Sequence, residues 1–206
     1  MPIDLAALVA PAHTVLLTQE CQRGVIGPES ALPALAEVAR RRLIPNVAAL
    51  ATAARAAGIR VVHCLAGSRA DGFGRNTNAR LFGGTRKAPV RNHIGTEPVS
   101  VVPEIGVGDD DVVLTRMQGV SPFGHSELDP ILRNAGVRTI VATGVSVNVA
   151  LLALAFEAVN AGYQVVMPRD AVAGFPEDYV EAVFQNSLGL VATLTTTAEL
   201  LALWQR

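Results

Sequence analysis

Residues 137–168 read VRTIVATGVSVNVALLALAFEAVNAGYQVVMP. Val137–Thr143 is an apolar, β-branched run, Val147–Ala161 is rich in Ala and Leu, and Tyr163–Pro168 is apolar again. The pattern predicts a strand, a helix that ends at Gly162, and a second strand. A strand–helix–strand unit of this kind is the building block of a parallel sheet.

The same alternation continues toward both ends of the chain. Four more apolar runs predict strands, at residues 13–18, 59–65, 111–116 and 190–194, which gives six strands in all. Helical patterns cover 32–57 (with a new helix beginning at Pro45), 128–135, 177–188 and a C-terminal stretch capped by Thr196 or Thr197. We therefore expect one α/β domain over residues 1–206, a three-layer α/β/α fold around a doubly wound, six-stranded parallel sheet of the Rossmann-like kind.

Residues 66–95 interrupt this alternation. The segment is rich in Gly, Asn and Arg and is longer than an ordinary connection between elements. Its basic residues outnumber its single acid, Asp71; they are Arg69, Arg75, Arg80, Arg86, Lys87 and Arg91. Two interpretations stay open: a solvated loop or subunit contact, and a segment that recognises an anion.

Composition excludes several classes of protein. The chain has 206 residues, a net charge of −1 and 50% hydrophobic residues, without the basic stripe of a nucleic-acid-binding protein. Its two cysteines, Cys21 and Cys64, are too few for a disulfide framework and predict reduced thiols and a cytoplasmic location. No apolar run reaches the ~18 residues of a membrane span, and the N-terminus does not resemble a signal peptide.

Ligands of open parallel sheets bind beyond the carboxyl ends of the strands. Glu20 directly follows the first strand, where partial burial favours a proton-donating carboxyl group; the alternative is a loop carboxylate paired with Arg23. Arg116 ends the third strand and can hold a carboxylate but cannot act as a base. A structural ion pair of Arg116 with Asp111 or Glu20 is the competing interpretation.

The turn after the fourth strand, Thr143–Ala150, offers free backbone amides for an oxyanion or carboxylate, unless Ser146 is simply the N-cap of the next helix. His63, His93 and His125 lack metal-ligand spacing, and we expect His63 to pack at the end of its strand. The chain contains no phosphate-binding loop and no dinucleotide fingerprint. The sequence therefore predicts neither a metal nor a cofactor.

Taken in order, several motifs resemble those of the isochorismatase-like (cysteine hydrolase) superfamily. The apolar strand and Glu20-Cys21-Gln22 are similar to the family's strand followed by D-x-Q. The further matching segments are 58–63, 99–104, 121–128 (SPFGHSEL, similar to S-A-F-x-G-T-x-L), 144–151 (GVSVNVAL, similar to G-V-x-T-N-x-C-V) and 158–171. The resemblance covers almost the whole chain and implies a homo-oligomer, a dimer or higher.

The family's usual catalytic residues are an Asp, a Lys and a Cys, and by this resemblance all three differ here. Glu20 stands at the Asp position, Arg116 or Met117 at the Lys position, and Ala150 at the vacated nucleophile position. Loss of the cysteine makes amide hydrolysis through an acyl-enzyme improbable. Members that cleave a vinyl ether, releasing pyruvate, need no cysteine, and Glu20 is a suitable acid for that reaction.

Two functions follow as expectations. The first is a hydrolase of a small anionic substrate, with Glu20 and Arg116 at the site. Its expected substrate-binding residues are Gln22, Arg69, Arg75, Arg80, Phe123, Ser146 and Asn148, with the arginine-rich segment suited to a dicarboxylate. The second is a catalytically inactive family member that binds a small anion or builds an assembly. Separately, apolar residues around most of the helix at 147–161 indicate burial, either by a partner subunit or by the chain's own last helix.

Overall fold

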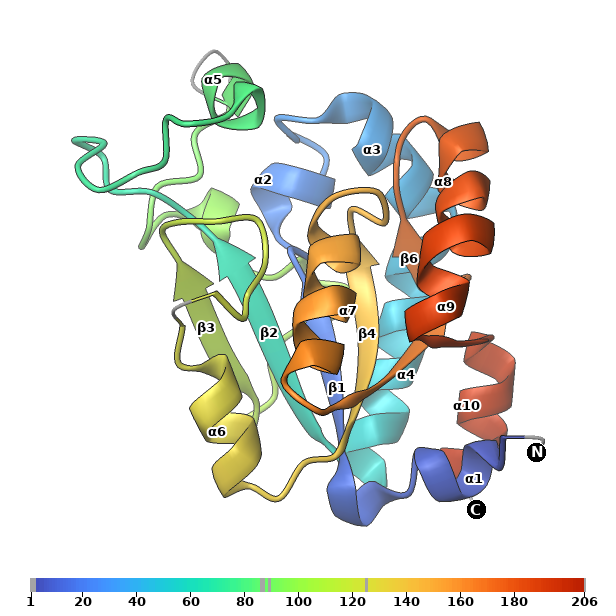
Figure 1. Ribbon diagram of the computed structural model, residues 1–206. Helices are drawn as coiled ribbons and strands as arrows, with labels where there is room; N and C mark the ends of the chain where they lie inside the picture. The colour runs from blue at the N-terminus through green and yellow to red at the C-terminus, as the bar shows by residue number, and fades with distance from the viewer. Residues whose placement is uncertain (1–2, 86–87, 89, 125, 206) are drawn as a thin grey trace.

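The computed structural model describes residues 3–85, 88, 90–124 and 126–205. These residues form an α/β fold in which a parallel sheet lies between two layers of helices (Figure 1). The strands are β1 (Thr14–Gln19), β2 (Arg60–Ala66), β3 (Val112–Arg116), β4 (Thr139–Val145), β5 (Gln164–Pro168), β6 (Val172–Ala173) and β7 (Thr193–Thr195). Arg86, Lys87 and His125 lie outside the described residues.

The strand order is β3-β2-β1-β4-β5-β7, and all neighbouring strands are parallel. The chain therefore runs outward in one direction from β1 to β3 and then returns to β4 on the other side of β1. The sheet is doubly wound, as predicted. The point where the strand order reverses lies between β1 and β4, which is where open α/β sheets bind their ligands.

Alternation of side chains along the central strands explains the three layers. On β1, Leu16 contacts one apolar cluster, whereas Val15 and Leu17 contact a second cluster on the opposite face. The first cluster is covered mainly by α4 (Ile44–Ala56) and α10 (Thr197–Trp204). The second is covered by α6 (Leu128–Asn134), α7 (Ala150–Asn160) and α8 (Glu177–Val183). Six of the strands are those predicted, and β6 is an added two-residue strand.

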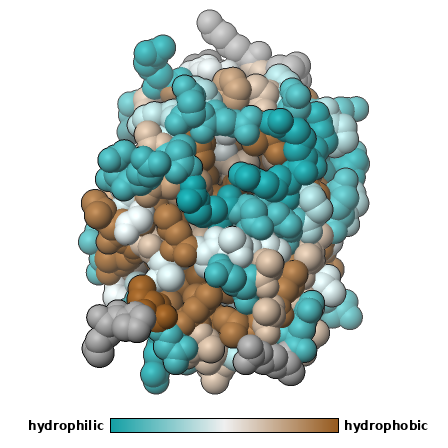
Figure 2. Space-filling view, turned by 90° about the vertical axis from the view of Figure 1, so that its right-hand side faces the viewer, coloured by the Kyte–Doolittle hydropathy of each residue, from teal (hydrophilic) through white to brown (hydrophobic). Residues whose placement is uncertain are grey.

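Shorter helical segments connect these elements. They are α1 (Leu5–Leu8), α2 (Arg23–Ile26), α3 (Pro33–Val38), α5 (Arg80–Thr85) and α9 (Gly189–Val191), the 3₁₀ turns Pro11–His13 and Glu97–Val99, and the π-helical turns Ala39–Leu43 and Phe184–Leu188. Figure 2 shows the face that carries α8, α9 and α10, where hydrophilic side chains gather toward the top and hydrophobic ones lower down. No helix in the described part of the chain is long and apolar enough to cross a membrane.

Several predicted boundaries are corrected by tertiary contacts. The last strand begins at Thr193 rather than residue 190, because residues 184–191 continue the preceding helix as a π-helical turn and α9. Helix α7 begins at Ala150 rather than Val147, because the backbone N–H of Val147 still donates to the carbonyl of Ala173 in β6. Within 66–95, which was expected to lack regular structure, α5 forms a short helix. Pro45 lies in the first turn of α4, but it does not begin a separate helix as predicted, because the backbone stays helical from α3 through the π-helical turn Ala39–Leu43 into α4.

His63 packs in the interior as predicted and is fully buried, but it lies in the middle of β2 rather than at its end. Its Nδ1 is 2.8 Å from the hydroxyl of Thr18, and its Nε2 is 3.1 Å from Asp111. Asp111 also accepts hydrogen bonds from Arg55 (2.6 Å) and from the backbone N–H of Gly108 (2.7 Å). Buried polar groups need such hydrogen-bond partners. The hydrogen bonds of His63 and Asp111 therefore connect β1 and β2 with α4.

Stability should fall as the pH drops below about 6.5, because burial lowers the pKa of His63 from its ordinary value of 6.5, against the opposing pull of Asp111. The folded state keeps this imidazole neutral while the unfolded chain takes up a proton. We expect wild type to lose about 1 kcal/mol more than His63→Gln between pH 7.5 and pH 5.5. Urea unfolding at the two pH values measures the difference. Equal losses in both proteins would rule out His63 as the source.

Candidate functional site

A pocket opens where the carboxyl ends of β1, β2, β3 and β4 meet, and its volume is about 220 Å³. Glu20 comes from the end of β1, Arg116 from the end of β3, and Ser146 from the turn after β4. Residues of the segment between β2 and β3, which includes α5, also line the pocket, and Figure 1 shows this segment above the ends of the strands. The pocket therefore occupies the position that the doubly wound topology favours for a ligand.

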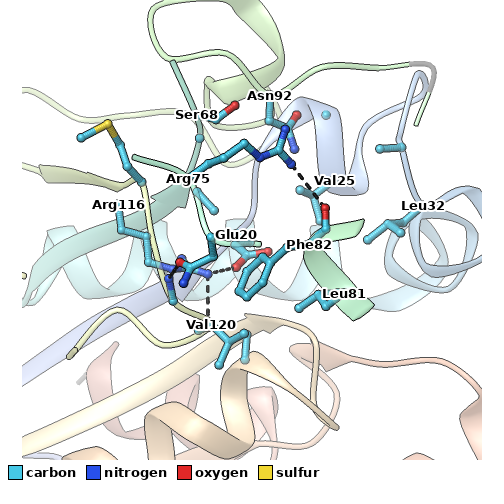
Figure 3. Close-up of a pocket in the computed structure, with 18 of the residues that line it drawn as sticks. Glu20, Val25, Leu32, Ser68, Arg75, Leu81, Phe82, Asn92, Arg116 and Val120 are labelled. Atoms are coloured by element: carbon cyan, nitrogen blue, oxygen red, sulfur yellow. Dashed lines mark hydrogen bonds and ion pairs between the residues drawn. The ribbon is translucent and has the colours of Figure 1, made fainter. Parts of the chain in front are cut away.

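Glu20 and Arg116 form an ion pair on the floor of the pocket (Figure 3). Arg116 Nη2 donates to Glu20 Oε1 and also to the carbonyl oxygen of Val120, at 3.1 Å. The side chains are 18% (Glu20) and 9% (Arg116) exposed, so water screens this pair less than a surface pair. The neighbouring Gln19 donates its amide N–H to the same Glu20 oxygen, at 2.9 Å. Two donors from β1 and β3 thus orient one carboxylate.

The backbone of Glu20 is unusual. Its φ is +51°, whereas the other described residues with positive φ are glycines. A left-handed conformation costs a non-glycine residue about 1–2 kcal/mol. Its N–H still bonds to the carbonyl of Cys64, at 2.8 Å, so the strain arises where the chain leaves the sheet. Strain that persists at such a position is typical of functional sites.

Arg116 keeps unused hydrogen-bonding capacity. Among the described residues its Nε and Nη1 are buried without a hydrogen-bond partner, and the same holds for the amide oxygen of Gln19. Unpaired buried donors of a cation are costly and are commonly satisfied by a bound group or water. These two donors are closed off from the open pocket, so it is the positive charge of Arg116, together with Arg75 and Arg91, that suits the pocket to an anionic group.

The turn between β4 and α7 forms one side of the pocket. Val145, Ser146, Val149 and Ala150 line it, and Ala150 is the first residue of α7. The alternative of Ser146 as N-cap is wrong: Val149 occupies that position, and the Ser146 carbonyl accepts from Val149 and Leu151. The side chain of Ala150 is a methyl group, so this side of the pocket carries no nucleophilic atom at the start of α7.

The structure identifies the ion-pair partners of the charged residues at the strand ends. Arg23 pairs with Glu97 (2.7 Å) rather than with Glu20. Asp111 pairs with Arg55, and Arg116 forms its ion pair with Glu20, which is one of the two pairs named as the competing interpretation for Arg116. Met117 lines the pocket as well and is 44% exposed, but the cation beside the carboxylate is Arg116.

The other expected binding residues lie in different places. Arg75 lines the pocket and donates to the carbonyl of Phe82, at 3.4 Å. Arg69 pairs with Asp71 at 2.8 Å in a second cavity, and Arg80 is exposed on α5 without lining either cavity. Arg91 lines the pocket together with Arg75, so two arginines of 66–95 reach the pocket, whereas Arg69 and Arg80 do not.

Gln22, Phe123 and Asn148 do not line the pocket either. The buried amide of Gln22 bonds to both backbone groups of Ala66, at 2.8 and 2.9 Å, and so holds the end of β2. Phe123 packs against Tyr163 in the core, with 5.8 Å between ring centroids. Asn148 donates to the carbonyl of Phe175, at 3.4 Å. These residues shape the frame around the pocket.

Three apolar residues of the pocket, Leu32, Leu81 and Phe82, were missed by sequence reasoning. Leu32 precedes α3, and the other two lie on α5. The signal was weak, since an isolated Leu-Phe pair in a polar segment is as consistent with a subunit contact as with a pocket wall. No group of three or more His, Cys, Asp or Glu side chains suited to a metal ion occurs among the described residues.

Both cysteines are buried, and neither lines the pocket. Burial raises the pKa of the Cys64 thiol to about 12, although Arg116 opposes the shift, and burial beside Glu20 also raises the pKa of Cys21. Both sulfurs are therefore protonated and shielded at neutral pH, which is the opposite of a reactive thiolate.

Thiol reactivity should reflect this burial. We expect neither cysteine to react with Ellman's reagent in the native protein within minutes at pH 8, and both to react in 8 M urea. The released chromophore gives the count directly. Rapid modification of one thiol in the native state would show that a cysteine is accessible, contrary to the structure.

Comparison with known proteins agrees with the fold and the order of motifs. An isochorismatase domain model matches residues 14–199. The chain is 33% identical over 132 residues to the uncharacterized isochorismatase family protein YwoC of Bacillus subtilis, across 64% of this chain and 66% of that one. It is 28% identical over 203 residues to the phenazine biosynthesis protein PhzD1 of Pseudomonas aeruginosa, across 98% of this chain and 91% of that one.

Solved structures share the architecture. The chain superposes with a TM-score of 0.84 on a cysteine hydrolase from Pseudomonas syringae pv. phaseolicola, at 22% identity, across 96% of this chain and 95% of that one. A nicotinamidase/pyrazinamidase from Bacillus subtilis gives a TM-score of 0.71, also at 22% identity, across 89% of this chain and 99% of that one. At 22% identity, the similarity to these solved structures shows a shared fold. The match of the domain model to residues 14–199 shows the family. The chain belongs to the isochorismatase family of hydrolases.

Proposed function

We propose that this protein hydrolyses a small anionic substrate without a cysteine nucleophile, with Glu20 as the general acid. The observation that carries the proposal is the Glu20–Arg116 ion pair on the floor of the pocket. Ala150 stands where the family resemblance expects the nucleophile, and Cys21 and Cys64 are both buried away from the pocket. The proposed chemistry is the cleavage of a vinyl ether, which needs an acid and a water but no acyl-enzyme.

The proposed steps follow from the positions of the two side chains. An anionic group of the substrate binds beside Arg116, which places the vinyl ether next to the carboxyl group of Glu20. Glu20 then transfers its proton to the methylene carbon of the vinyl ether, which leaves an oxocarbenium ion. Water adds to the cationic carbon and returns a proton to Glu20. The resulting hemiketal breaks its C–O bond to give a ketone and an alcohol.

Substrate turnover tests the proposal. Wild-type protein is incubated with isochorismate, as the vinyl-ether probe, and with a panel of primary amides, including nicotinamide. We expect pyruvate release from isochorismate and no ammonia release from any amide. Ammonia release at a comparable rate would overturn the proposal, because it requires a nucleophile that the pocket is not expected to contain.

The alternative function is that of a catalytically inactive family member, which binds a small anion or builds an assembly. The three arginines that line the pocket, Arg75, Arg91 and Arg116, favour anion binding with or without chemistry. Absence of turnover on every substrate, together with carboxylate binding measured by calorimetry, would favour this alternative over the hydrolase.

The outer face of α7 supports a homo-oligomer. Leu151 and Leu154 are buried in the chain's own core, whereas Phe156 is 45% and Val159 39% exposed. Adjacent apolar side chains left in contact with water on one helix are typical of a surface that another subunit covers.

Phe156→Glu is therefore expected to convert an oligomer into monomers, because it places a charge in an apolar contact. Sedimentation velocity at micromolar concentration measures the change, with Val107→Glu as the control, since Val107 is exposed in the loop before β3. A wild-type protein that already sediments as a monomer would remove the oligomer from the proposal.

A further inference from the structure

Gln19, the last residue of β1, is a polar side chain on an apolar face of the sheet. Side chains alternate along a strand, so Gln19 shares a face with Val15 and Leu17, which belong to the apolar cluster covered by α6, α7 and α8. Gln19 is fully buried. A parallel strand covered on both faces is normally apolar throughout. The position in the sheet therefore does not explain an amide here.

The side-chain amide of Gln19 makes a single hydrogen bond among the described residues. Its Nε2 donates to Glu20 Oε1, at 2.9 Å. Its own Oε1 is buried and has no hydrogen-bond partner in the same part of the chain. A buried oxygen without a donor lowers the stability of the fold, whereas an apolar side chain of similar shape carries no such penalty. The amide therefore serves Glu20 rather than the stability of the sheet.

Gln22 provides the contrast. It is also fully buried, but its side chain accepts from the N–H of Ala66 and donates to the carbonyl of Ala66, at 2.8 and 2.9 Å, and it donates to the carbonyl of Pro98 at 3.4 Å. Both polar ends of Gln22 thus have backbone partners, as expected of a buried amide that stabilises a fold. Gln19 lacks this arrangement.

The two oxygens of the Glu20 carboxylate have different surroundings. Gln19 Nε2 and Arg116 Nη2 both donate to Oε1, and Figure 3 shows the contact with Arg116. Oε2 accepts from no donor among the described residues, and it is not among their buried atoms that lack a partner. Since Glu20 lines the pocket and its side chain is 18% exposed, Oε2 is the oxygen that stays accessible.

This asymmetry decides which oxygen can carry a proton. Amide and guanidinium N–H groups only donate, so an oxygen that accepts from both stays an acceptor when the carboxyl group is protonated. The proton then resides on Oε2. Its transfer breaks the O–H bond at Oε2 and leaves that electron pair on the carboxylate, while the π electrons of the vinyl ether form the C–H bond at the methylene carbon.

We propose that Gln19 is a positioning residue for acid catalysis, whose amide fixes Oε1 of Glu20 so that the proton is delivered from Oε2 into the pocket. The inference rests on the proposed function for the role of Glu20, and on the hydrogen bonds of Gln19 for the choice of oxygen. Without this amide, Arg116 alone holds Oε1, and the carboxyl group turns more freely about its last bond. A misdirected proton lowers the rate of transfer without weakening substrate binding.

Gln19→Met tests the inference, because methionine keeps the length of the side chain and lacks the amide. We expect kcat for pyruvate release from isochorismate to fall at least about tenfold. Calorimetry should show unchanged affinity for the saturated analogue of isochorismate, which carries a 1-carboxyethyl ether in place of the vinyl ether. The urea midpoint of Gln19→Met should equal or exceed that of wild type, whereas that of Gln22→Met should fall. A reduced midpoint of Gln19→Met with an unchanged kcat would overturn the inference.

A double variant shows whether Gln19 acts through Glu20. In the Glu20→Gln background the acidic proton is absent, so adding Gln19→Met should reduce the residual rate no further. A further loss as large as that in the wild-type background would overturn the inference, whatever the stability of the variants.

Failure of the inference is distinguishable from failure of the proposed function. A wild-type protein that releases no pyruvate overturns the hydrolysis and, with it, the role of Gln19. A wild-type protein that releases pyruvate, with Gln19→Met equally fast, overturns only the role of Gln19 and leaves Glu20 as the proposed acid.

Discussion

Gly144→Ala is expected to cost at least about 3 kcal/mol of folding stability, and to lower soluble yield sharply. Gly144 has a φ of +105°, which side chains with a Cβ rarely adopt. An added Cβ would lie 2.1 Å from the carbonyl oxygen and 2.7 Å from the nitrogen of Gln19. Both are backbone atoms of the neighbouring strand, where Gln19 pairs with Gly144, so neither can rotate away.

The clash would also disturb the pocket, because Gln19 precedes Glu20 and Gly144 precedes the turn that carries Ser146. Gly162→Ala is the matched control: its φ is +92°, but nothing lies within 4 Å of the added Cβ. The control should lose only the roughly 1–2 kcal/mol of left-handed backbone strain. Urea unfolding of both proteins gives the difference. A Gly144→Ala protein as stable as Gly162→Ala would show that β1 and β4 are less closely apposed.

The fold followed from the sequence because its signals are local and repeated. The apolar runs of β1 and β4 and the glycine after α7 each mark an element without reference to the rest of the chain. The errors came where tertiary contacts decide. Two residues of β6 extend β4 as far as Val145, and Leu190 belongs to a helical segment although its apolar neighbours suggested a strand.

The site was harder to predict, because strand order decides which strand ends meet. Glu20 and Arg116 were both singled out, but their contact, 96 residues apart in sequence, depends on β2 lying between β1 and β3. Gln22 and Phe123 occupy motif positions yet serve the frame of the pocket. The apolar residues of the pocket were missed because Leu81 and Phe82 acquire their role only when α5 folds over the sheet edge.

Glu20→Gln is expected to reduce the rate of hydrolysis at saturating substrate by at least about 100-fold, the usual contribution of a general acid. The amide retains the size of the carboxyl group, and its oxygen can still accept from Arg116 and Gln19, so the pocket should remain intact. What it loses is the acidic proton that the mechanism transfers to carbon. Glu181→Gln is the control, since Glu181 is 49% exposed and pairs with Arg169 outside the pocket.

The central claim is that Glu20 performs acid catalysis in a pocket without a cysteine nucleophile. Its most direct test is the rate of pyruvate release by wild type, Glu20→Gln and Glu181→Gln at saturating vinyl-ether substrate, with analogue binding measured alongside. The account predicts a loss of about 100-fold or more in Glu20→Gln alone, with the analogue still bound. A Glu20→Gln protein that releases pyruvate at the wild-type rate would contradict it.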